Sequence, residues 1–215
     1  MFAYLASVAG TMNTRRIIDP ATSAGIYSIL GALVVPRPIA WVSTRSADGV
    51  ENLAPHSFFQ IVSTSPPIVM ISTMGEKDTA RNARETGELV VCGAPVDLIE
   101  QINLSGVEFP ADRSEFVELG LTSEPSERVA PPRVAQSPYA LECRVVDIIE
   151  MGNGVLIFGE VVLVAIDEDM MEGARVRAQG LDLLSRLGGN AWGEIGTQHD
   201  VPRVTWEQYQ QTTRP

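Results

Sequence analysis

The sequence predicts a mainly β protein: an antiparallel barrel, closed or partly closed, with a few helices at its periphery. Short apolar segments rich in β-branched residues recur at close spacing, and turn-forming residues separate them. The two longest strand candidates are joined by one tight turn. Helical segments are too few and too irregularly placed for a regular alternation of strands and helices.

The first predicted strands form a hairpin. Apolar residues run nearly continuously over 33–42 and are interrupted by Pro-Arg-Pro, which suits a strand entered through a kinked edge. Ala-Asp-Gly at 47–49 then leads into a second extended stretch over 50–59, so 39–59 is predicted as a β-hairpin. After a double proline, residues 68–72 are predicted as a short buried strand.

A helix follows this strand. Asp78 or Thr79 is predicted to cap it, and its body is 80–86. Gly87 stands where a helix needs a left-handed terminal residue. Residues 88–92 are then predicted as the next strand.

The second half of the chain begins with short helices and ends in long strands. Helices are predicted at 96–104 and 112–119, and the Pro- and Ser-rich segment 122–138 is predicted as a surface excursion. Strands at 139–150 and 155–167 are joined across Gly-Asn-Gly, which contains the Asn-Gly preferred in tight hairpins.

A single domain over 12–215 is predicted, because neither a flexible linker nor a fixed-period repeat divides the chain. Residues 1–11 are apolar but lack the preceding basic residue of a secretory signal, and we expect them to be a disordered or mis-started extension. No apolar run approaches the roughly 18 to 20 residues of a membrane helix.

Charge and cysteine content exclude several classes of partner. The formal net charge of -11 disfavours nucleic acid and anionic membranes, so neither is expected as a partner. Cys92 and Cys143 match no zinc spacing, and free buried thiols in a reducing cytoplasm are expected, with no metal site. Among the 16 basic residues only Lys77 is a lysine.

Five motifs occur in a specific order between about Tyr27 and Trp192. The motifs are P-R-P-I-A-W-V-S-T at 36–44, N-L-A-P-H-S-F-F at 52–59, K-D-T-A-R-N at 77–82, S-P-Y-A-L-E-C at 137–143, and R-L-G-G at 186–189 followed by Trp192. With these motifs in this order, the chain resembles the flavin reductase-like, FMN-binding split-barrel family, which implies a Greek-key antiparallel β-barrel.

The resemblance implies FMN as cofactor, and the helix start at Lys77 suits its phosphate. Lys77, Asp78 and Thr79 would offer an ammonium, a hydroxyl and free backbone amides, while Ser43 and Thr44 would add hydroxyls from a neighbouring strand. The alternative is that Lys77 is a solvated surface charge and Asp78-Thr79 only a cap.

The isoalloxazine ring needs a flat slot with polar groups at its edge. Asn52, the backbone around Leu53 and Ala54, and Ser57 fit this need, because an extended segment containing Pro55 cannot pair fully in a sheet. The alternative is that Asn52 closes the hairpin turn and Ser57 lies on a strand face.

Four further residues receive separate interpretations. Arg37 is expected to help neutralise phosphate or to pair with an acid. Trp41 is predicted to lie in the core. The resemblance implies that Gly189 and Trp192 contribute to the flavin site, where the glycine would let the backbone approach the ligand closely.

Similarity to the family implies an NAD(P)H:flavin oxidoreductase that supplies reduced flavin to a partner monooxygenase. It also implies a homodimer with the flavin near the subunit interface. No side chain is assigned as catalytic, because the cofactor carries the chemistry. NADH and NADPH are not distinguished, and FAD or riboflavin remain alternatives to FMN. Two alternative functions are also consistent with the sequence: an electron-transfer protein that holds FMN tightly without a nicotinamide site, and a non-enzymatic ligand-binding barrel.

Overall fold

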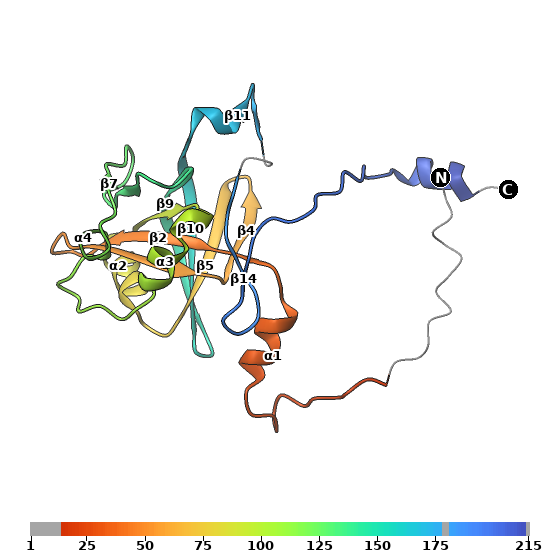
Figure 1. Ribbon diagram of the computed structural model, residues 1–215, viewed down its shortest axis with the longest axis horizontal. Helices are drawn as coiled ribbons and strands as arrows, with labels where there is room; N and C mark the ends of the chain where they lie inside the picture. Colours follow the sequence, from red (N-terminus) through yellow and green to blue (C-terminus); the bar gives the residue numbers. More distant parts are fainter. Residues whose placement is uncertain (1–13, 178–180, 214–215) are drawn as a thin grey trace.

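The computed structural model describes residues 14–177 and 181–213, which form an antiparallel barrel with helices around it (Figure 1). The expected extension at 1–11 lies outside the described residues. The main strands are β2 (Ala40–Arg45), β3 (Glu51–His56), β4 (Phe59–Thr64), β5 (Pro67–Met74), β6 (Glu88–Cys92), β9 (Tyr139–Met151) and β10 (Gly154–Ile166). They form one seven-stranded sheet in the order β3-β2-β6-β9-β10-β5-β4, and each neighbouring pair is antiparallel.

Short strands and helices complete the chain. Two-residue strands are β1 (Arg37–Pro38), β7 (Ser123–Glu124), β8 (Arg133–Val134), β11 (Met171–Glu172), β12 (Arg175–Val176), β13 (Ser185–Arg186) and β14 (Trp192–Gly193). The α-helices are α1 (Ile26–Leu33), α2 (Asp78–Thr86), α3 (Ile99–Leu104), α4 (Glu115–Glu118) and α5 (Trp206–Thr213), with 3₁₀ turns η1 (Val96–Leu98) and η2 (Glu168–Met170). Among the described residues, no helix is long and apolar enough to cross a membrane.

The connection between β3 and β4 dictates the curvature of the sheet. These strands are the two outer edges of the sheet, yet only Ser57 and Phe58 separate them in the chain. A flat sheet of seven strands would hold its edges about 29 Å apart, whereas the step from His56 to Phe59 reaches at most about 11 Å. The sheet must therefore curl until its edges approach, and the barrel stays open along the seam between β3 and β4.

The central strands are buried on both faces, which explains their continuous apolar sequences. In β6, Leu89 and Val91 belong to a cluster that includes Ala80 and Ala83 of α2. The alternate residues of β6 pack with α3 and α4 in a second cluster, which also contains Trp41. The Trp41 side chain is fully buried, and its Nε1 donates to Ser105 Oγ at 2.9 Å, so its predicted core position is confirmed.

Both predicted hairpins are present. β2 pairs with β3, and β9 pairs with β10 over nearly their whole lengths. The longer hairpin turns at Gly152 and Asn153, with positive φ at Gly152. The glycine before the asparagine therefore makes the turn, instead of the Asn-Gly dipeptide.

Two strand predictions need correction. Residues 33–42 are not one strand, because α1 ends at Leu33 and the Arg37 guanidinium donates to the carbonyls of Gly31 and Val34, each at 2.6 Å, at the end of that helix. The stretch 50–59 is also divided, since β3 ends at His56 and β4 begins at Phe59.

The predicted cap of α2 was wrong by one or two positions. Lys77 is the N-cap residue, in an extended conformation, and Asp78 is already helical. The Asp78 carboxylate pairs with Arg81 at 2.6 Å, one turn along the helix, instead of capping it. Gly87 ends the helix in a left-handed conformation, as predicted.

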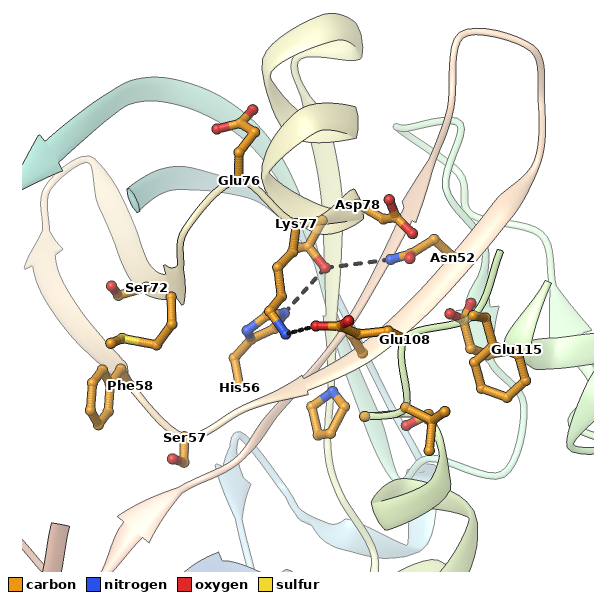
Figure 2. A pocket seen from close by; sticks show the side chains of 18 of the residues that line it. Asn52, His56, Ser57, Phe58, Ser72, Glu76, Lys77, Asp78, Glu108 and Glu115 are labelled. Carbon is orange, nitrogen blue, oxygen red and sulfur yellow. Dashed lines mark hydrogen bonds and ion pairs between the residues drawn. The ribbon is translucent and has the colours of Figure 1, made fainter. Parts of the chain in front are cut away.

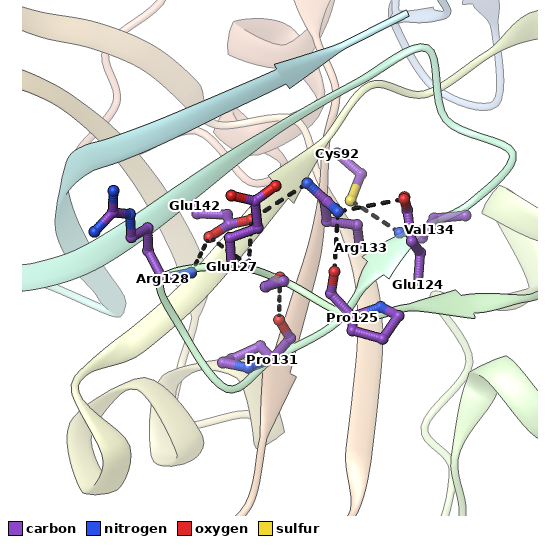
Figure 3. A network of polar contacts seen from close by, with 10 residues as sticks. Cys92, Glu124, Pro125, Glu127, Arg128, Pro131, Arg133, Val134 and Glu142 are labelled. Atoms are coloured by element: carbon purple, nitrogen blue, oxygen red, sulfur yellow. Dashed lines mark hydrogen bonds and ion pairs between the residues drawn. The ribbon is translucent and has the colours of Figure 1, made fainter.

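The segment 122–138 is not a surface excursion, because Val129 and Val134 belong to the core. Its anchor is Glu142, a fully buried residue of β9 (Figure 3). The Glu142 carboxylate accepts from the backbone N–H of Glu127 and Arg128, the latter at 2.7 Å. It also lies 3.5 Å from a guanidinium nitrogen of Arg133. Loop-like composition hides this packing, because the acceptor comes from a distant strand.

Candidate functional site

A cavity of about 480 Å³ opens beside the seam (Figure 2). Its wall combines β3 and the residues after it, the end of β5, the start of α2, the segment 105–109 and Glu115 at the start of α4. This volume lies within the usual range for small-molecule and cofactor sites.

The predicted flavin contacts from two motifs meet in this cavity. Asn52, Ala54 and Ser57 line it from β3 and the residue after that strand, and Lys77, Asp78 and Thr79 line it from the start of α2. Figure 2 shows Asn52, Ser57, Lys77 and Asp78 around the cavity. β3 and α2 are separated by more than twenty residues in the chain, and only the curled sheet brings them together. Whether flavin binds there stays a prediction.

The other predicted residues lie outside the cavity. Leu53 is fully buried on the opposite face of β3, since neighbouring side chains of a strand point to opposite sides, and its N–H donates to Glu115 Oε2 at 2.9 Å. Ser43 and Thr44 are fully buried in β2. Arg37, Gly189 and Trp192 lie in the neighbouring substructure formed around β1, β13 and β14.

A buried hydrogen-bond network ties β2, β3 and α2 together beneath the cavity. Thr44 Oγ1 accepts from Asn52 Nδ2 and from Asn82 Nδ2, both at 3.1 Å. Thr79 Oγ1 lies 3.4 Å from Asn52 Nδ2 and 3.2 Å from His56 Nε2. Asn52 therefore does more than close the turn, because its buried amide fixes the start of α2 against β3.

The N-terminus of α2 suits an anion. No side chain among the described residues caps this helix, so its first-turn amides are donors without intrahelical acceptors. Lys77 at the N-cap adds an ammonium, which pairs with Glu108 at 3.1 Å. Because both side chains are substantially exposed, this ion pair is weak and its ammonium is exchangeable. Amides, hydroxyl and ammonium together match the donors that a phosphate requires.

Two titratable residues in the cavity wall have shifted pKa values. Burial, with a smaller contribution from Lys77, lowers the pKa of His56 from 6.5 to about 4, so its imidazole is neutral near pH 7. Burial raises the pKa of Glu115, which a hydrogen bond from Leu53 N–H partly offsets.

Arg37 and the R-L-G-G motif hold α1. Arg37 donates to Leu187 O at 3.0 Å as well as to the end of α1, and its Nε lies 3.4 Å from Ser57 Oγ. A Cβ on Gly188 would lie 3.0 Å from Ala32 of α1, so this glycine permits close backbone packing. The Trp192 ring lies under the Arg186 guanidinium at 4.7 Å.

The sequence interpretation missed several residues of the cavity wall. His56 and Phe58 both lie within the motif at 52–59, but neither is among the flavin contacts predicted above. No sequence pattern identified the remainder, which comprises Tyr27, Ser72, Met74, Glu76, Glu115 and the segment 105–109.

Comparison with known proteins identifies relatives that share this fold. The model of the flavin reductase like domain matches residues 32–181. An uncharacterized protein of Halalkalibacterium halodurans is 36% identical over 193 residues, which cover 85% of this chain and 92% of that protein.

Two solved structures are also similar. Nitrilotriacetate monooxygenase component B from Bacillus cereus is 32% identical, with a TM-score of 0.85, covering 88% of this chain and 100% of that one. Pseudomonas fluorescens 2-nitrobenzoate 2-nitroreductase NbaA is 28% identical, with a TM-score of 0.82, covering 89% and 98%. The fold alone is also shared by a more distant split-barrel protein from Shewanella frigidimarina, which is 18% identical, with a TM-score of 0.79, covering 86% of this chain and 96% of that one.

The neutral state of His56 predicts a pH-dependent stability. The unfolded chain takes up a proton on this histidine below about pH 6.5, whereas the folded chain does so only near pH 4. Stability should therefore fall as the pH decreases from 6.5 towards 4, by about 2 kcal/mol at pH 5. Urea unfolding at pH 7 and pH 5 measures this loss, and the His56→Gln variant should lose that much less stability than wild type. An equal loss of unfolding free energy in the two proteins would show that folding does not lower the pKa of His56.

Proposed function

The chain belongs to the flavin reductase-like family, and we propose that it is an FMN-binding NAD(P)H:flavin oxidoreductase that supplies reduced flavin to a partner monooxygenase. The observation that carries this proposal is the convergence of the uncapped α2 N-terminus, Lys77 and the polar end of β3 on one cavity. FMN, when bound, supplies the redox chemistry by accepting a hydride and passing electrons on. The protein has to bind, align and shield it.

The residues of the chain divide this work. Thr79 and the first-turn amides of α2 would hold the phosphate, with Lys77 released from Glu108 as the cation. Asn52, Ala54 and Ser57 would line the ring, since their strand leaves polar groups unpaired at the seam. The phosphate-binding start of α2 favours FMN over riboflavin.

The likeness to component B of a nitrilotriacetate monooxygenase supports a partner oxygenase as electron acceptor. We propose the cytoplasm as the compartment, because the two cysteines are buried free thiols, which suits a reducing environment. A second candidate is a flavoprotein that retains FMN and reduces a bound acceptor directly. The likeness to a nitroreductase favours this second candidate.

The first test of the proposal is an assay of the purified protein with NADH, NADPH and added FMN. Rapid oxidation of either nucleotide that requires free FMN supports the reductase. A retained flavin that NAD(P)H hardly reduces supports the electron-transfer protein. A retained flavin that passes electrons from NAD(P)H to a nitroaromatic acceptor without free FMN supports the second candidate. Absence of flavin binding in a titration would reject all three and leave the non-enzymatic barrel.

Lys77→Ala should weaken FMN binding by about 1 to 3 kcal/mol, because the ammonium meets the phosphate. Riboflavin binding should hardly change. Fluorescence titration with both flavins measures the two affinities. Arg113→Ala is the matched control, since Arg113 likewise pairs with one glutamate, Glu118, and neither of these residues lines the cavity. Equal losses for FMN and riboflavin would mean that Lys77 does not meet the phosphate.

We also propose that the protein is a homodimer with the flavin site near the interface. Large apolar side chains of α1, the residue after it and β4 are exposed in the protomer: Leu33 by 74%, Val34 by 60% and Ile61 by 65%. The first turn of α1 lies near the start of β4, since Tyr27 contacts Phe58, the residue before that strand. The segment 194–213 runs away from the barrel and exposes Trp206, which suits an arm that wraps a second copy (Figure 1). Because Tyr27 lines the cavity, an interface on α1 lies next to it.

The dimer should have a mass about twice the 23.3 kDa of the chain, measured by size exclusion with light scattering. Leu33→Asp should shift it towards the monomer, because a carboxylate would be buried in an apolar contact. Val117→Asp, at an equally exposed position of α4, should leave the dimer intact. A monomeric wild type would contradict the proposal.

A further inference from the structure

Helix α1 reaches the cavity although it contributes nothing to the core. All of its residues are at least partly exposed, including a run of apolar side chains. Its first turn nevertheless carries Tyr27 to the cavity wall, with the tyrosine ring 6.5 Å from that of Phe58 and tilted by 55°. The proposed dimer contact would account for its exposed apolar side chains, but not for the position of Tyr27 at the cavity.

Among the described residues, the hydrogen bonds from the rest of the chain to α1 lie at the C-terminal end of the helix. Arg37 binds the carbonyls of Gly31 and Val34 there, and the backbone of Gly188 packs against Ala32. Arg37 itself is fixed by Leu187 O. The motifs P-R-P and R-L-G-G thus hold the C-terminal end of α1. Because the helix is rigid, they also position its first turn, where Tyr27 lies beside Phe58.

The cavity has two chemically different ends. The inner end holds polar groups, namely Asn52, His56 and Thr79, which are all buried. The exposed part of the wall carries the Lys77–Glu108 ion pair and Tyr27, which is 61% exposed in the protomer and lies beside Phe58. Because the two rings are tilted and 6.5 Å apart, they do not stack on each other, and the exposed tyrosine retains area for a ligand.

An exposed aromatic side chain suits a planar ring that exchanges with solvent at every turnover. Stacking on an aromatic side chain binds such a ring without requiring a fixed hydrogen-bond pattern. The electron donor has to enter and leave in each cycle, whereas the buried polar network at the inner end and the start of α2 are assigned to FMN. This step rests on the proposed function.

We propose that Tyr27, together with Phe58, forms the subsite that stacks on the nicotinamide ring of the donor nucleotide. Tyr27 is a binding residue for the donor, and Arg37 and Gly188 are positioning residues that act through α1. FMN occupies the inner end, so Tyr27 contributes to donor affinity and not to FMN affinity.

The test measures binding without turnover. FMN-loaded protein is titrated with NAD⁺ or NADP⁺, which cannot reduce the flavin, and the perturbation of the flavin spectrum gives the dissociation constant. Tyr27→Ala should raise this constant about tenfold, and Tyr27→Phe should restore it, because the ring and not the hydroxyl stacks. The FMN affinity of Tyr27→Ala should equal that of wild type.

Tyr209→Ala is the matched control, as the same substitution on an exposed tyrosine outside the cavity. In steady state, Tyr27→Ala should raise KM for the donor and leave kcat nearly unchanged. Unchanged nucleotide affinity, a parallel loss of FMN affinity, or failure of wild type to bind either nucleotide would overturn the subsite. Tyr27-dependent nucleotide binding in a protein that oxidises neither NADH nor NADPH would instead retain the subsite and reject the reductase.

Discussion

Two residues carry the chain from one edge of the sheet to the other, and the rest of the molecule depends on this short step. Ser57 and Phe58 force the seven strands to curl, because no flat sheet could bring β3 and β4 so close. The edges approach without pairing, so the barrel retains an open seam. The cavity lies beside that seam, where β3 ends and its polar groups lack a neighbouring strand.

The cavity places uncapped helix amides within an acidic protein. The chain has a net charge of -11, and carboxylates of Glu76, Asp78 and Glu108 line the cavity. Each of these carboxylates pairs with a cation, through Arg84, Arg81 and Lys77 respectively. Backbone amides at the start of α2 remain as donors whatever the surface charge, which explains how an acidic protein can present a site for phosphate.

Buried charged side chains fasten the irregular segments. Arg37 holds α1 and the R-L-G-G turn by binding three backbone carbonyls. Glu142 holds the segment 122–138 by accepting from two backbone amides and pairing with Arg133. In both cases one buried charge is matched by several partners, as its removal from water requires. Segments that look like free loops in the sequence are therefore fixed parts of the fold.

The sequence by itself determined the features that depend on local chemistry. The glycine after α2, both hairpins and the core position of Trp41 follow from turn residues and apolar patterning, and five ordered motifs identified the family. The motifs at 52–59 and 77–82 also contain the predicted cavity residues at β3 and α2, because each group lies within one short segment of the chain.

Only the tertiary structure decided which side chains share the cavity and which are structural. Leu53 faces the core between two cavity residues because of strand alternation, and Arg37 is occupied by backbone carbonyls of a helix that the sequence did not reveal. Tyr27, Glu115 and the segment 105–109 reach the cavity from distant parts of the chain. Their positions follow from the closure of the sheet. A local sequence pattern does not indicate contacts between residues that are far apart in the chain.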